Sequence, residues 1–143
     1  MIALATRDDM KRAIGMADGY AGQKIHEKTF VDWWGQMIER GLATVLYRES
    51  NGEMKEVIGI LMFDSPFTGE KAATIGFWYV ADFEEKSLAR GLLFRRAYEF
   101  LKNMGCKTIS CHPVLNTNFN GFSRFLQRQG FVPVEVQYKK EIT

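Results

Sequence analysis

The stretch DFEEKSLARGLL, Asp82 to Leu93, carries residue types at a spacing that could bind an anion. It follows the apolar run ATIGFWYV and leads into an amphipathic segment, so it marks a passage from strand to helix. The first N–H groups of a helix have no partner within the helix and attract anions. Lys86 and Arg90 bracket the turn and can add charge-assisted hydrogen bonds to phosphate oxygens. The stretch is either an anion-binding turn or only a turn, and its sequence leaves both interpretations open.

Charge is distributed unevenly along the chain, although the net charge is only +2. Residues 1–85 contain 9 lysines and arginines against 14 acidic residues, and residues 86–143 contain 10 against 3. A positive C-terminal part suits a polyanionic ligand, either a nucleotide cofactor or a nucleic acid. Chance variation in the composition of solvated faces is the alternative explanation.

Length and composition predict one soluble domain over residues 1–143. No apolar run approaches the roughly 20 residues that cross a bilayer, and the first residues do not resemble a signal peptide. Cys106 and Cys111 lack any metal-ligand spacing with the two histidines. We therefore expect a cytoplasmic protein with reduced thiols, no metal site and no membrane association.

The order of apolar patterns and turn signals predicts a mixed sheet covered by helices. Strands are expected at residues 2–6, 42–50, 53–63, 73–80, 107–112 and 131–142, and helices at 10–22, 29–40, 88–104 and 118–129. Asn51 and Gly52 form the dipeptide best suited to a tight antiparallel hairpin. A strand–helix–strand crossover follows the antiparallel part. The fold class is therefore α+β (α/β three-layer), with a mixed, mostly antiparallel central sheet flanked by helices.

Apolar stripes indicate which helix faces are buried. The first stripe comprises Phe30, Trp33, Trp34, Met37 and Ile38, and the second comprises Leu88, Leu92, Leu93, Ala97, Phe100, Leu101 and Met104. Gly41 and Gly105 are predicted to end these two helices.

With its elements in this order, the chain resembles the GNAT superfamily of N-acetyltransferases over nearly its whole length. The segments FWYV and LLFRRAYEFLKNMGCKTI are similar to the family's central strand and cofactor helix. RFLQRQGF and YKKEI are similar to its F-Y-x-x-x-G-F helix end and closing strand, and SLAR resembles small bacteriophage-encoded members. The resemblance implies acetyl-CoA, or another acyl-CoA, as cofactor. It also implies acyl transfer to an amine of a small molecule, a peptide N-terminus or a lysine.

The family's cofactor signature, [Q/R]-x-x-G-x-[G/A], aligns with residues 84–89, EEKSLA, where only Ala89 matches. Ser87 stands where glycine is usual, and its hydroxyl can cap the helix or bond a phosphate. The cradle itself is made of backbone N–H groups, and this stretch contains no proline. The resemblance implies cofactor contacts from Trp78, Tyr79, Val80, Lys86, Ser87, Leu88, Ala89, Arg90 and Asn118. Helix capping is the alternative role of Asn118.

Catalysis in the family uses a backbone N–H of a bulged central strand to stabilise the oxyanion, and a tyrosine to protonate the leaving sulfur. Gly76 fits such a bulge, or else it leaves room for a neighbouring aromatic ring. Leu126 occupies the tyrosine position and has no proton to donate. Candidate replacements are Tyr79, His112 and Tyr138, while core packing and a strand-end loop bond are the structural alternatives for Tyr79 and His112. Cys111 is discounted as a nucleophile because only His112 lies near enough in sequence to lower its pKa.

By resemblance, the N-terminal helices form the acceptor side. Trp33, Trp34 and His26 are therefore candidate substrate-binding residues, although the same aromatic stripe also suits a core. The negative N-terminal part suits a cationic acceptor such as an amine.

Three function classes remain. The first is an acyl-CoA-dependent N-acyltransferase, and the second is a non-catalytic binding or accessory protein of the same fold, which Leu126 and Glu84 favour. The third, modification or binding of nucleic acid, ranks last because the chain lacks an aromatic-basic recognition motif. A homodimer is left open.

Overall fold

The computed structural model describes residues 1–17, 25–81, 86–112 and 119–143, with residues 86–90 and 119 described in their backbone only. The chain divides into two compact units, Met1–His112 and Pro113–Thr143. The first unit contains β1 (Ile2–Leu4), the 3-10 turn η1 (Arg7–Asp9), α1 (Met10–Ala17), α2 (Glu27–Glu39), β2 (Ala43–Ser50), β3 (Glu53–Asp64), β4 (Lys71–Val80), α3 (Lys86–Asn103) and β5 (Thr108–Cys111). The second unit contains α4 (Phe119–Arg128).

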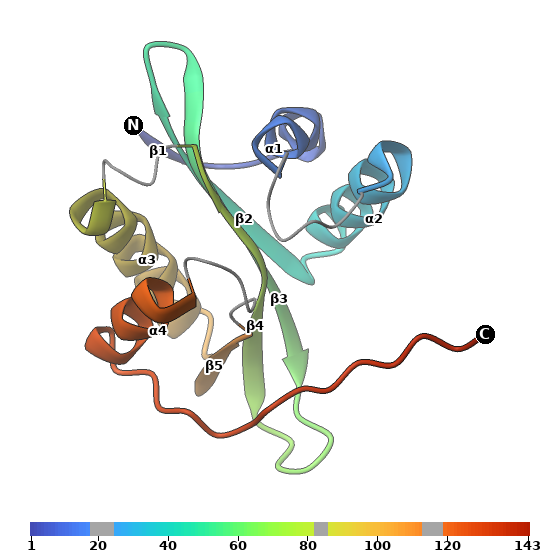
Figure 1. Ribbon diagram of the computed structural model, residues 1–143. Coiled ribbons are helices and arrows are strands. Elements are labelled where there is room, and N and C mark those ends of the chain that lie inside the picture. The colour runs from blue at the N-terminus through green and yellow to red at the C-terminus, as the bar shows by residue number, and fades with distance from the viewer. Residues whose placement is uncertain (18–24, 82–85, 113–118) are drawn as a thin grey trace. The chain divides into compact units, whose positions relative to one another are not determined.

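The sheet of the first unit has the strand order β1-β2-β3-β4-β5 (Figure 1). The first four strands pair antiparallel, and β4 pairs parallel with β5 through the α3 crossover. The turn between β2 and β3 has positive φ at both Asn51 (52°) and Gly52 (77°), as the twist of a two-residue hairpin requires. The predicted mixed, mostly antiparallel α+β architecture is confirmed.

Helices cover both faces of this sheet (Figure 1). Side chains of α1 and α2 pack with Val57, Phe77 and Tyr79 in one buried cluster. On the opposite face, Phe94 of α3 stacks on Trp78 of β4, with ring centroids 5.8 Å apart. The alternation of side chains along β4 therefore sends Phe77 and Tyr79 toward α1 and α2, and Trp78 toward α3.

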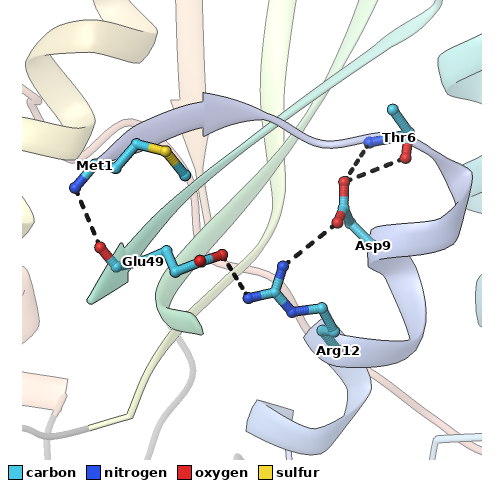
Figure 2. A network of polar contacts seen from close by, with 5 residues as sticks. All are labelled: Met1, Thr6, Asp9, Arg12 and Glu49. Carbon is cyan, nitrogen blue, oxygen red and sulfur yellow. Dashed lines mark hydrogen bonds and ion pairs between the residues drawn. The ribbon is translucent and has the colours of Figure 1, made fainter. Parts of the chain in front are cut away.

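A network of polar contacts joins the α1 region to the end of β2 (Figure 2). The guanidinium of Arg12 lies 2.7 Å from the Glu49 carboxylate and 3.5 Å from that of Asp9. Asp9 in turn accepts a hydrogen bond from the Thr6 N–H at 2.8 Å, and the Met1 ammonium donates to the Glu49 carbonyl at 3.1 Å. These contacts hold β1 and α1 against β2, on the side of the sheet that carries Trp34.

Two details of the predicted helices need correction. In α3, Leu93, Phe94, Ala97 and Leu101 are buried, whereas Leu92 is 47% exposed and Met104 is 42% exposed. The buried face of α3 is thus rotated from the predicted stripe, because packing on Trp78 selects Phe94. The helix predicted at residues 10–22 is described as far as Ala17, and residues 18–24 lie outside the described ranges.

The strand predicted at residues 131–142 is not formed. These residues have neither helix nor strand, and the alternating side chains of Val132, Val134, Val136, Tyr138 and Ile142 are 73–99% exposed. A strand requires a hydrogen-bonded neighbour, and the described part of the second unit contains none. Alternating apolar and polar residues predict the side-chain pattern of a strand, but they do not provide the neighbouring strand with which it must pair. Among the helices described, none has the length and apolarity to cross a membrane.

Candidate functional site

Gly76 interrupts the regular pairing of β4. Ile75 pairs with Ile60 and Phe77 pairs with Gly59, so Gly76 is an extra residue on β4 and forms a β-bulge. A Cβ atom at position 76 would lie 2.8 Å from Cζ2 and from Cη2 of Trp34. Gly76 is exposed between buried neighbours. Both interpretations of Gly76 are therefore correct, because it forms the bulge and also leaves room for an aromatic ring.

The ladder between β4 and β5 ends at this bulge. Its last pair is Ile75 with Cys111, whereas β4 continues to Val80. Strand β5 ends at Cys111, so the β4–β5 ladder does not extend along residues 76–80. Backbone groups beyond the end of a ladder can bond an extended ligand that carries amides of its own.

Helix α3 begins at Lys86, after β4 ends at Val80. The N–H groups of residues 86–89 form its first turn and have no acceptor within the helix. The predicted cofactor residues Lys86, Ser87, Leu88, Ala89 and Arg90 all fall in the first five positions of α3, where the structure describes only the backbone. Ser87 lies in the first turn of α3, and its hydroxyl as a helix cap or a phosphate ligand stays a prediction.

The side chain of Trp78 is held on the α3 face. Its indole Nε1 donates a 2.8 Å hydrogen bond to Oε1 of Glu56, which is fully buried. Arg48 Nε lies 3.6 Å from the other carboxylate oxygen of Glu56. This contact keeps the Trp78 side chain beneath α3, whereas Val80, the last residue of β4, is partly exposed. Sequence reasoning missed Glu56, although an acidic residue at an inward position of a strand was a usable signal.

Tyr79 packs in an aromatic cluster on the opposite face. Its ring stacks on Phe77 at 5.0 Å, and Phe77 meets Trp34 edge-on at 4.7 Å. Tyr79 is 8% exposed and belongs to the buried core of that face. This placement favours core packing over proton donation.

The predicted substrate-binding residues separate into two environments. Trp34 lies against the bulge, and Trp33 meets it edge-on at 5.2 Å while remaining 45% exposed. His26 caps the start of α2, where its Nδ1 accepts from the Thr29 N–H at 3.3 Å and lies 2.8 Å from the Thr29 hydroxyl. The structure thus brings Trp34 to the bulge with Trp33 packed against Trp34, and it gives His26 a capping role.

The remaining candidates lie beyond the end of β5. His112 is exposed and directly follows Cys111. Burial raises the pKa of the Cys111 thiol to about 12, so this thiol stays protonated near neutral pH and is a poor nucleophile. Asn118 lies outside the described residues, and Tyr138, in the second unit, is 91% exposed.

A pair of hydroxyls that sequence reasoning missed lies next to the bulge. Ser110 of β5 donates a 3.0 Å hydrogen bond to Oγ1 of Thr74 on β4. Thr74 pairs across the sheet with Leu61, which packs against the core cluster that contains Trp34. The two hydroxyls therefore share a face with Trp34, one residue before the ladder ends. Within the described ranges, no group of three or more His, Cys, Asp or Glu side chains could hold a metal ion.

Comparison with known proteins identifies the architecture. No protein-family model and no curated protein matches the sequence. Among solved structures, a transcriptional regulator from Bacillus halodurans superimposes with a TM-score of 0.81 at 17% identity, covering 99% of each chain. A GNAT family acetyltransferase from Staphylococcus aureus gives 0.74 at 14% identity, covering 99% of this chain and 98% of the other. An aminoglycoside 6'-N-acetyltransferase from Acinetobacter haemolyticus gives 0.74 at 18% identity, covering 100% and 99%.

Proposed function

Because the chain has the fold of the GNAT superfamily of N-acetyltransferases, we propose that it is an acyl-CoA-dependent N-acyltransferase. The observation that carries the proposal is that the β4–β5 ladder ends at the Gly76 bulge while β4 itself continues to Val80. We extend the proposal to a single acyltransferase domain over residues 1–143 that acts in the cytoplasm.

The residues present fit an acyl-CoA. The pantetheine arm carries amide groups that can pair with backbone groups of β4 beyond the last β4–β5 pair, as an added strand would. The N–H groups of the first turn of α3, which have no acceptor within the helix, suit the diphosphate, and Lys86 and Arg90 would add positive charge. Ser87 and Asn118 are further candidates for this contact. When bound, the cofactor supplies an acyl group activated as a thioester.

The bulge suits stabilisation of negative charge. In acyl transfer an oxyanion develops on the thioester carbonyl, and a preorganised backbone N–H is an effective donor to it. The extra residue at Gly76 breaks the ladder, so that backbone groups there are not all used between strands. We assign the oxyanion contact to this bulge.

The acceptor is a cationic amine in this proposal. The buried Trp34 lies beside the bulge and the exposed Trp33 packs on it, so we propose that the two rings border the attacking nitrogen. His112 is exposed and directly follows β5, and an imidazole nitrogen can accept a proton, so we assign to it the removal of a proton from the acceptor ammonium. Tyr79 and Tyr138 rank below it, because one is packed in the core and the other lies in the second unit.

A non-catalytic binding protein of the same fold is the second candidate. Leu126 stands where the family resemblance places a tyrosine, and its hydrocarbon side chain has no proton to donate. A protein that retained the cofactor site and lost the proton donor would bind acyl-CoA without turnover.

Thermal unfolding with acetyl-CoA tests both candidates. At a hundred times its Kd, a ligand of the native state adds about 2.7 kcal/mol, which raises Tm by about 5–10 °C in a chain of this size. Thiol release is then measured with kanamycin, with a peptide that begins with alanine and with a peptide that contains lysine. Arg90→Glu should abolish the thermal shift, whereas Arg96→Glu, on the exposed part of α3, should preserve it.

Each outcome selects one interpretation. No thermal shift at millimolar acetyl-CoA would exclude the enzyme and the cofactor-binding protein alike. A shift without thiol release over the three acceptors would favour the binding protein. Retarded migration of a short DNA in a gel, with binding that weakens steeply as salt rises, would instead support nucleic-acid binding.

A further inference from the structure

We propose that the hydroxyls of Thr74 and Ser110 form a proton relay that takes the place of the missing tyrosine. The relay rests on the proposed acyltransferase function and assigns the transfer of one proton, from the attacking nitrogen to the leaving sulfur, to these two residues.

The position of the pair carries the proposal. Thr74 and Ser110 are strand partners, and the next pair, Ile75 with Cys111, is the last one before β4 and β5 part. Both residues face the side of the sheet where Trp34 lies against the bulge. Ser110 is exposed and Thr74 is partly exposed, so the pair can be reached from solvent. The hydroxyls thus lie one pair before the end of the β4–β5 ladder, close to the bulge to which we assign the oxyanion contact.

The hydrogen bond within the pair gives the relay its direction. Ser110 donates to Thr74 at 3.0 Å, which leaves the hydroxyl proton of Thr74 available to another acceptor. It also leaves lone pairs on the Ser110 oxygen available to an N–H donor. A chain of this kind can accept a proton at one end while it releases one at the other.

The step balances with no other reactant. The nitrogen of the neutral amine forms a bond to the thioester carbon, and the carbon–sulfur bond breaks as the carbonyl re-forms. The nitrogen loses a proton to Ser110, Ser110 passes its own proton to Thr74, and Thr74 passes its proton to the sulfur. The products are an amide and a thiol, and both hydroxyls end as they began.

The neighbouring groups are poorly suited to this step. Cys111 follows Ser110 on the strand and so faces the opposite side, and burial keeps its thiol protonated. A purely structural role for the Thr74–Ser110 bond would amount to a cross-strand contact of about 0.2–1 kcal/mol, with no effect on proton transfer.

Single-turnover acetyl transfer from acetyl-CoA to kanamycin, or to whichever of the three acceptors the wild type uses, tests the relay. Thr74→Val and Ser110→Ala should each slow transfer by about 10²-fold or more, the range of general acid–base catalysis. Thr74→Ser retains a hydroxyl and should transfer within about threefold of wild type. Thr108→Val is the matched control, since Thr108 shares the face of Ser110 but pairs with Ala72, which has no hydroxyl.

Two measurements distinguish a role of the hydroxyls in proton transfer from a purely structural role. The acetyl-CoA thermal shift should be unchanged in all four variants, and the solvent deuterium isotope effect on transfer should fall in Thr74→Val and Ser110→Ala. Wild-type rates in those two variants would overturn the relay, and so would an equal loss in Thr74→Ser and Thr74→Val. Failure of the acyltransferase function itself gives a different result: the wild-type protein shows no thermal shift with acetyl-CoA, or releases no thiol.

Discussion

A side chain at position 76 and the ring of Trp34 would occupy the same space, because a Cβ on Gly76 would lie 2.8 Å from two carbons of that ring. Gly76→Ala must therefore displace Trp34 or the bulge, and overpacking of this kind costs about 1–3 kcal/mol. We expect a lower urea midpoint together with slower acetyl transfer. Gly15→Ala is the control, since nothing lies within 4 Å of its Cβ and alanine favours a helix.

A second substitution checks the cause of the Gly76 effect. Trp34→Phe removes the part of the ring that the new methyl group meets. Combined with Gly76→Ala, it should recover part of the lost stability, giving a coupling between the two sites. Strict additivity of the two losses would show that the Trp34 ring is not what position 76 accommodates.

The buried carboxylate of Glu56 provides another prediction. Glu56→Ala removes the acceptor of the Trp78 indole and leaves Arg48 beside a cavity, and loss of one member of a buried pair costs about 3–5 kcal/mol. The free energy of unfolding in urea measures this loss. Glu53→Ala on the same strand breaks only the exposed ion pair with Lys55 and should change stability by less than about 1 kcal/mol. Equal effects of the two substitutions would contradict the buried role of Glu56.

The raised pKa of the buried Cys111 thiol makes the free energy of unfolding depend on pH. Burial raises its pKa from 9.0 to about 12. Between these values the unfolded chain has lost this proton while the folded chain retains it, so stability falls as pH rises from about 9 to 12. Urea midpoints at pH 8, 9 and 10 should fall less steeply in Cys111→Ala than in wild type. Identical slopes would show that the thiol is not protected by burial.

A proline substitution can test whether a single backbone N–H at the start of α3 contributes to cofactor binding. Lys86→Ala removes a charge, and Lys86→Pro removes the same charge together with one N–H, at a helix position that tolerates proline. The unliganded Tm values of the two variants should therefore agree closely. If the helix start binds the diphosphate, acetyl-CoA should raise Tm less in the proline variant than in the alanine variant. Equal shifts would mean that the Lys86 N–H takes no part in binding.

Much of the fold could be predicted from local patterns. Asn51 and Gly52 require positive φ and so determine a tight turn whatever surrounds them. The crossover from β4 through α3 to β5 follows from period and order alone. The passage from strand to helix after ATIGFWYV was likewise predictable from the sequence.

The sequence determined the element types within residues 1–112, the hairpin and the helix ends at Gly41 and Gly105, because each depends on local periodicity or on a residue's own conformational limits. Only the tertiary structure decided that the ladder ends at Gly76, that Thr74 meets Ser110 and that Glu56 binds Trp78. Each of these is a contact between two strands, and it depends on which strands pair and in which register. Residues 131–142 show the same limit, since their alternation is clear and a strand still needs a neighbour.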